Sequence, residues 1–281
     1  FKEESDYSAI VPSMVAKNKI SFGYFGNGDN IEINTLTQLP DTITATILKE
    51  RNKDTLNYWF TPFEMDSIIF TVTNEKLKIQ DTFSVKNRKV GLDSLLLNLN
   101  QRGTLQFDKQ LAILSNTPLV KADSSKISFI NKDSLNFPYT LVLDSVENKL
   151  DVLFELQANE KYKMQLLPGT VLDFFGNTND TIAYSFRTKS LADYGNLQMN
   201  VIGDSISYPI IVQLLNEKEE VQREIYAEGP QVFEFNHIDP TNYLVRVVFD
   251  ENKNKKWDTG SNLKKKQKEE INNNRSRIHR R

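Results

Sequence analysis

The sequence predicts an all-β protein made of consecutive β-sandwiches, and two observations carry this prediction. Apolar and polar residues alternate one by one, and turn residues interrupt the alternation at short intervals. In Lys161–Leu167, for example, Tyr162, Met164 and Leu166 fall on one face of an extended segment. Strands that are buried on one side need this pattern, because successive side chains point to opposite faces of a sheet. Many short strands separated by turns are typical of sandwich folds.

The turn residues divide the chain into strand-length pieces. Ile20–Phe25 and Asn30–Ile33 flank Asn27-Gly28, a dipeptide that adopts the positive φ angles of a tight hairpin. Other breakers are Pro168-Gly169, Gly176-Asn177, Gly229-Pro230 and Asp239-Pro240. β-branched and aromatic residues are dense between them, as a pleated, half-buried surface favours. The remaining expected strands are Ile43–Lys49, Leu56–Phe60, Ser67–Thr73, Leu77–Val85, Leu92–Leu97, Lys126–Ile130, Tyr139–Val146, Leu150–Leu156, Lys161–Leu167, Ile182–Arg187, Gly195–Ile202, Ile206–Leu215, Val221–Ala227, Gln231–Asn236 and Asn242–Asp250.

The length of 281 residues predicts two or three domains. We place a first sandwich at 1–92, which could lack its first strand, and a second at 93–190. A short junction follows, and 196–263 forms a third, smaller sandwich. Alternation disappears in 264–281, so we expect a disordered basic tail there.

Composition excludes several classes of protein. Cysteine is absent, which removes disulfides, thiolate nucleophiles and cysteine-based metal sites, and there are only two histidines. The formal net charge of −2 argues against a nucleic-acid binder. The richest apolar run, Tyr208–Leu215, is far shorter than the ~20 residues of a membrane-spanning helix. Any membrane anchor is therefore expected upstream of Phe1.

The basic tail has eight Lys and Arg residues against two Glu residues. It could bind anionic lipid headgroups or nucleic acid through counterion release. No aromatic side chain interrupts it, which argues against base stacking. We expect a solvated chain end.

Two strings in the second and third units resemble a known family. Tyr162–Asp180, followed by Tyr184-Ser-Phe-Arg-Thr188, looks like the end of an S-layer-associated bacterial Ig-like domain. Asp239–Asp250 and Asn252–Gly260 are similar to prealbumin-like sandwiches. Together they resemble the C-terminal half of the Ig-like-domain surface lipoproteins of Bacteroidetes.

This resemblance implies tandem Ig-like and prealbumin-like β-sandwiches in a non-catalytic protein outside the cytoplasm, at the bacterial outer membrane or cell surface. It also implies a further strand after Lys266, where this chain has a polar, basic sequence instead. The expected partners are other proteins of the cell envelope.

One segment has the spacing of a calcium loop. Asp250, Asn252, Asn254, Lys256 and Asp258 stand at every second position, with Lys256 offering a backbone carbonyl. Ca²⁺ prefers six to eight oxygen ligands arranged in this way. The match is partial, because the sixth position lacks glycine and the twelfth lacks glutamate. A plain turn rich in Asn and Asp is the alternative to a weak Ca²⁺ site.

The densest aromatic cluster is Tyr58-Trp59-Phe60. On a strand, Tyr58 and Phe60 share one face and Trp59 takes the other. Core packing is the usual role of such residues. An exposed Trp59 could instead stack on a sugar ring or bind a partner.

No catalytic motif converges in the sequence. Gly23, Gly26 and Gly28 precede a strand rather than the helix of a phosphate-binding loop. His237 lies near Asp239, but no Gly-x-Ser-x-Gly motif supplies a nucleophile. We therefore predict a non-enzymatic rigid spacer or protein-binding scaffold. The alternative is a module that binds carbohydrate or peptidoglycan.

Overall fold

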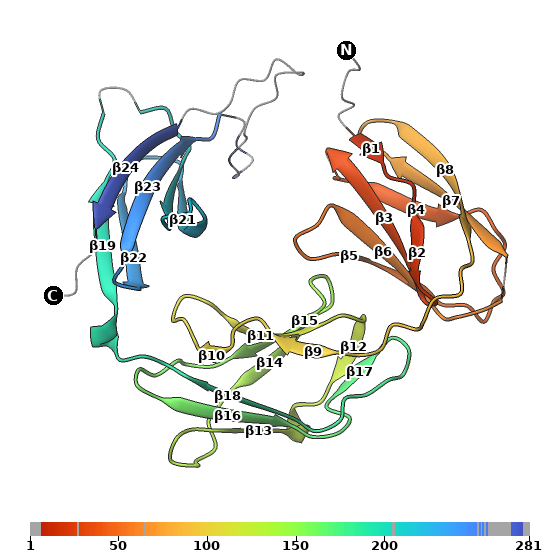
Figure 1. The fold of residues 1–281 in the computed structure, drawn as a ribbon, viewed down its shortest axis with the longest axis horizontal. Helices are drawn as coiled ribbons and strands as arrows, with labels where there is room; N and C mark the ends of the chain where they lie inside the picture. The colour runs from red at the N-terminus through yellow and green to blue at the C-terminus, as the bar shows by residue number, and fades with distance from the viewer. Residues whose placement is uncertain are drawn as a thin grey trace.

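The computed structural model describes residues 7–26, 28–64, 66–203, 206–251, 253, 255, 257 and 271–277. Within these residues it contains β-strands and two short 3₁₀ helices, which confirms the predicted all-β class. The strands form three domains, which follow one another around a U (Figure 1). The second domain forms its base, and the first and third form its arms.

The first domain is a sandwich of two antiparallel sheets. One sheet has the order β1-β3-β6-β5, with β2 also paired to β3, and the other has the order β4-β7-β8. Tyr58 and Phe60 of β6 point into the core, where the Tyr58 ring meets Phe70 edge-on at 5.2 Å. The strands are β1 (Tyr7–Ala9), β2 (Ser13–Ala16), β3 (Lys19–Gly26), β4 (Ile31–Thr35), β5 (Ala45–Lys49), β6 (Thr55–Phe60), β7 (Ser67–Asn74) and β8 (Ile79–Lys86).

The second domain packs two four-stranded sheets around a cluster of aromatic rings. The sheet orders are β10-β18-β16-β13 and β14-β15-β11-β9, beside a small β12-β17 pair. Phe129 lies at the centre, 4.9 Å from Phe154 and 5.6 Å from Tyr162. The elements are β9 (Leu97–Leu99), β10 (Gly103–Thr104), β11 (Leu111–Ser115), β12 (Leu119–Ala122), η1 (Ser124–Lys126), β13 (Ile127–Ile130), β14 (Thr140–Asp144), β15 (Lys149–Leu153), β16 (Lys161–Leu166), β17 (Val171–Asp173) and β18 (Ile182–Arg187).

The third domain packs the β19-β22 pair against a sheet of order β21-β20-β23-β24. β20 is buried on both faces, which explains why all of its residues except Gln213 are apolar. The elements are η2 (Leu191–Asp193), β19 (Gly195–Asn200), β20 (Ile210–Leu215), β21 (Val221–Ala227), β22 (Val232–Ile238), β23 (Asn242–Phe249) and β24 (Ile271–Arg277).

The predicted disorder of the tail differs from the structure at 271–277. This segment is β24 and pairs antiparallel with β23, from Asn242 opposite Arg277 to Val248 opposite Ile271. Strands pair through backbone hydrogen bonds, which any residue but proline can donate, and this polar sequence carries no alternation that could predict the pairing. A strand after Lys266 was the expectation from the family resemblance.

Two other predictions differ from the structure. β3 and β4 do not pair as a hairpin, because β4 pairs with β7 in the opposite sheet. β3 already has strands on both sides, with β1 and β2 along one edge and β6 along the other. The predicted strand Leu92–Leu97 is mostly linker, and only Leu97 belongs to β9.

Candidate functional site

The candidate functional features of this molecule are its two junctions between domains. We call the linker 87–96 and the contacts around it the first junction, and the linker 188–194 with its contacts the second junction. Each junction has one arginine that reaches across into the second domain.

Arg51 closes the first junction. It lies in the turn between β5 and β6, where Asn52 adopts a positive φ of 58°. Its Nη1 donates hydrogen bonds to the carbonyls of Glu147 and Asn148, both at 3.0 Å, and its Nη2 donates to Ser115 at 2.7 Å. All three acceptors are backbone oxygens of the second domain. A planar guanidinium can satisfy several acceptors at once, so one side chain fixes two hairpins against each other.

Asn148 prepares these acceptors. It holds a positive φ of 49° in the β14–β15 turn, and its buried side-chain amide donates to Ser115 and Thr117 carbonyls. Its Oδ1 accepts from the Leu119 backbone N–H at 2.9 Å. These hydrogen bonds all lie within the second domain and hold the acceptors of Arg51 in place.

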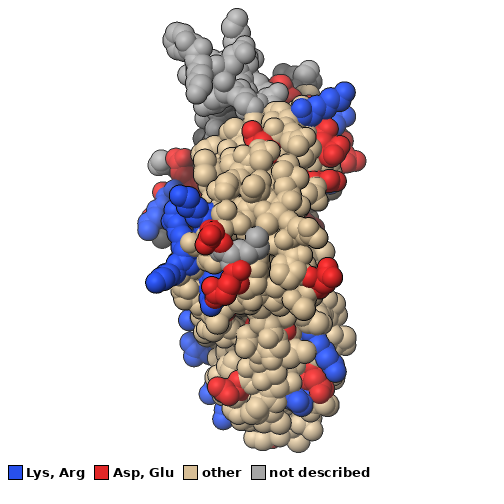
Figure 2. Space-filling model, turned by 90° about the vertical axis from the view of Figure 1, so that its right-hand side faces the viewer, with Lys and Arg blue, Asp and Glu red and all other residues tan. Residues whose placement is uncertain are grey.

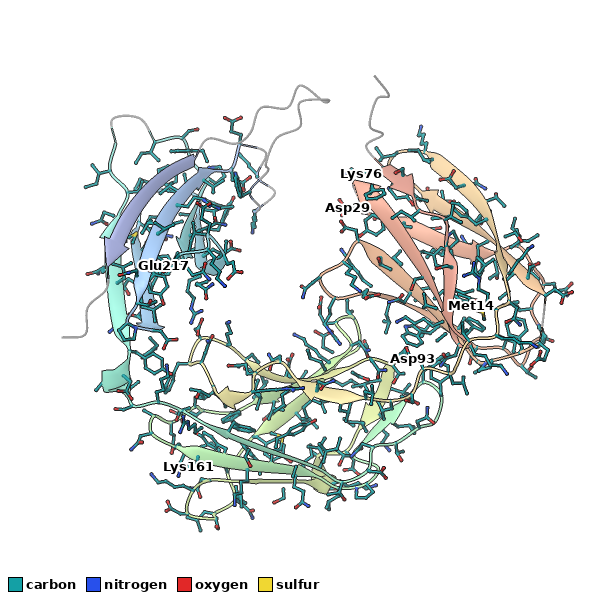
Figure 3. All side chains as sticks on the ribbon, in the orientation of Figure 1. Met14, Asp29, Lys76, Asp93, Lys161 and Glu217 are labelled. Atoms are coloured by element: carbon teal, nitrogen blue, oxygen red, sulfur yellow. The ribbon has the colours of Figure 1, made fainter. Side chains whose placement is uncertain are left out.

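Two asparagines bind the linker of the first junction. Asn18, which is 1% exposed, accepts from the Asp93 N–H at 3.2 Å. From the other side, Asn116 accepts from the Leu96 N–H at 2.7 Å and donates to the Ser94 carbonyl at 2.8 Å. Figure 3 shows Asp93 where the first two domains meet. The linker is therefore hydrogen-bonded to both domains.

Trp59 belongs to this junction. As the alternation predicts, its side chain points away from the core that contains Tyr58 and Phe60. The ring lies 6.1 Å from Phe175 of the second domain, and Lys19 Nζ lies 4.6 Å above it. Trp59 is only 2% exposed, so in this arrangement no ring face is open to a sugar.

Arg223 closes the second junction by an ion pair. Its Nη2 donates to Asp108 Oδ1 at 2.7 Å, and its Nε lies 2.6 Å from Oδ2. Arg223 comes from β21 and Asp108 from the loop after β10. Only Nη2 has hydrogen-bond geometry towards this carboxylate, and Nε adds electrostatic attraction at close range.

An aromatic group and a second ion pair complete the second junction. Phe107 packs against His237 at 5.1 Å and against Tyr194 at 5.7 Å. Lys189 Nζ lies 2.6 Å from Asp239 Oδ1, and this hydrogen bond raises the pKa of the Lys189 ammonium. His237, which lies in β22 and has a positive φ of 55°, thus contributes to the contact between the second and third domains.

Most of the predicted calcium loop lies outside the described residues, namely Asn252, Asn254, Lys256 and Asp258. Asp250 is fully buried, and its Oδ2 accepts from the Lys255 N–H at 2.9 Å. The Ca²⁺ site remains a prediction. If it is real, millimolar Ca²⁺ will raise the thermal midpoint of the wild type but not of Asp250→Ala.

In the part of the chain that the structure describes, no three His, Cys, Asp or Glu side chains group as metal ligands would. Within the same residues, no helix is long and apolar enough to cross a membrane. The polar side chains of the junctions hold domains together, and none of them pairs a nucleophile with a base.

These contacts define a class of protein, a tandem of β-sandwich domains with closed junctions. No family model matches the chain, and no curated protein matches its sequence. Among solved structures, titin domains A168–A170 share 10% identity over 85% of this chain and 90% of that chain, with a TM-score of 0.22.

Two further solved structures have similar values. A Bacteroides ovatus mixed-linkage glucan utilization locus protein, SGBP-B, in complex with a heptasaccharide, shares 9% identity over 81% of this chain and 65% of its own, with a TM-score of 0.26. Chicken CNTN1 domains FN1–FN3 share 7% identity over 86% and 91%, with a TM-score of 0.20. Similarity at this level carries no conclusion about ligands or partners.

Proposed function

We propose that this protein is a non-catalytic scaffold that holds binding surfaces at fixed separation. The observation that carries the proposal is the closure of both junctions by side chains from neighbouring domains. Domains joined by short linkers otherwise move relative to one another by default. Arg51 and Arg223 oppose that motion here.

We place the scaffold outside the cytoplasm, at the surface of a bacterial cell, as part of a Bacteroidetes lipoprotein. The sequence strings that resemble such proteins support this assignment. Its partners would be other envelope proteins. Crosslinking of intact cells followed by mass spectrometry tests it, and crosslinks to cytoplasmic proteins alone would contradict it.

A module that binds carbohydrate or peptidoglycan is the alternative function. Trp59, its candidate platform, is enclosed between two domains, so this alternative would need another aromatic surface. Glycan-array binding that persists in Trp59→Ala would favour such a surface.

The rigidity of the junctions can be measured with thiol-reactive spin labels. The chain has no cysteine, so the labels attach only to cysteines introduced at chosen positions. Lys76, Lys161 and Glu217 are exposed and lie on the three different domains (Figure 3). We expect narrow distance distributions between spin labels at pairs of these positions. Broad distributions for the pairs 76–161 and 161–217 would overturn the proposal.

A further inference from the structure

A groove opens at the first junction, beside the end of β5. Its volume is about 360 Å³, within the range of ligand-binding sites. Both domains line it, and basic side chains outnumber acidic ones by four to one. The charged side chains are Lys19, Lys49, Arg51 and Lys53 against Glu50.

The single carboxylate of this groove is already engaged. Glu50 pairs with Lys53 and accepts a hydrogen bond from Asn57 at 3.1 Å. Arg51 donates to neutral carbonyls. Among the described residues, neither Arg51 nor Lys49 has a carboxylate within ion-pair distance. The groove therefore keeps positive charge that an anionic group could neutralise.

The larger groove of the first domain differs in this respect. Lys17, Arg88 and Lys89 line it together with Glu64 and Asp66. Figure 2 shows Lys and Arg side chains gathered with Asp and Glu side chains beside them on the face turned to the viewer. Three basic side chains stand against two acidic ones in this larger groove, so its excess of positive charge is smaller than that of the groove beside β5.

β5 adds a second feature to the basic groove. It is the last strand of its sheet, and no strand of the described residues pairs with its outer edge. It lies on the inner side of the U (Figure 1). Ala45, Thr46, Ile47 and Leu48 are uncharged, and Ile47 is 39% exposed. Such an edge presents unpaired N–H and C=O groups to any extended chain, and charged residues usually protect it.

β21, an edge strand of the third domain, shows the usual protection, because Arg223 and Glu224 occupy its middle. β5 has one charged residue, Lys49, and it stands at the end that lines the groove. An uncharged edge that runs into a basic groove has the features that recognise an extended chain with acidic residues at one end.

We propose that an extended acidic peptide segment of a partner protein adds to β5 as a further strand, with its carboxylates beside Lys49 and Arg51. This inference rests on the proposed scaffold function and names its docking edge. Backbone pairing over five residues would provide affinity, and the groove would select negative charge.

The test uses the full chain and three synthetic peptides labelled with fluorescein. The first alternates Glu and Val over nine residues, the second has Lys in place of Glu, and the third has N-methylated amides that cannot pair with a strand. We expect the acidic peptide to bind at least about tenfold more tightly than the other two. Hydrogen exchange should show protection of the amides of 45–49 in its complex.

Two variants locate the site. Lys49→Glu should weaken binding of the acidic peptide about tenfold, since it reverses the charge at the groove. Lys86→Glu is the matched control, because Lys86 ends β8, which is also an edge strand of this domain. It should leave the affinity unchanged.

Equal affinity for the three peptides, no binding of the acidic peptide, or equal loss in both variants would overturn the proposal. A further result would also overturn it: oligogalacturonate binds, this binding is lost in Lys49→Glu, and the acidic peptide does not protect the amides of 45–49. The groove would then be a site for an acidic glycan. The spin-label distances are measured independently, so the scaffold proposal can survive this result.

Discussion

The two junctions of this molecule solve one mechanical problem with different chemistry. At the first, Arg51 donates to three backbone carbonyls, and asparagine side chains bind the linker. At the second, ion pairs cross between side chains, and the Lys189–Asp239 pair is 40% and 51% exposed. Neutral acceptors cannot be titrated, whereas exposed ion pairs weaken with salt. The first junction should therefore tolerate changes of solvent that loosen the second.

The largest expected effect is that of Trp59→Ala. Removal of a buried tryptophan costs about 3–5 kcal/mol, and here the loss includes contact with Phe175 across the first junction. Urea denaturation measures the free energy of unfolding. The distance distribution between spin labels at 76 and 161 should also broaden. Trp59→Phe, which keeps a ring, is the control. A loss below about 1 kcal/mol would mean that the ring contributes little to the junction.

Arg51→Ala should follow. Hydrogen bonds from a charged donor contribute roughly 1.5–3 kcal/mol each when removal leaves acceptors buried, and partial exposure of Arg51 reduces their sum. We expect about 2–4 kcal/mol less coupling between the first two domains. Arg51→Lys keeps the charge but not the planar donors, so it should rescue only part of the loss. Full rescue by lysine would contradict the geometric role of the guanidinium.

A smaller effect should come from the Arg223–Asp108 pair. A double-mutant cycle with both alanine variants should give a coupling of about 1 kcal/mol. The coupling should decrease between 50 mM and 1 M salt, because the ions are screened. The same salt range should leave the 76–161 distance distribution unchanged. A coupling that does not respond to salt would remove the contrast between the junctions.

The smallest effect concerns alkaline pH. Asp239 raises the pKa of Lys189 above its ordinary value of 10.5 in the folded protein. The pair therefore stabilises the second junction fully below that value, and this stabilisation is lost as pH rises through the folded pKa. The 161–217 distribution should broaden at high pH in wild type but not in Lys189→Arg. Equal broadening in both would point to another group.

The sequence predicted the sheets far better than the contacts between domains. Alternation in Lys161–Leu167 identified Tyr162, Met164 and Leu166, which the structure buries. Alternation also put Trp59 on the face opposite Tyr58, but it could not say what covers that face. Alternation predicts which side chains are buried, but it does not predict which domain covers them.

The residues that close the junctions left no sequence signal. The acceptors of Arg51 lie 64–97 positions away and are backbone carbonyls, which every residue has. Arg223 and Asp108 are 115 positions apart. β24 was missed for a related reason, since edge pairing needs no apolar face. Only the fold itself brings such partners together.

The U described above also determines how the chain would behave under tension. A pull on its two arms acts on the bends before it acts on the strands, because a few side-chain contacts hold each bend while whole sheets hold each sandwich. At high salt the contacts of Arg223 would break before those of Arg51, so the second junction would open before the first. The chain would then lengthen in two steps while every domain stays folded. The molecule would thus extend at its bends under tension, and it would return to the U-shaped arrangement when the tension is removed.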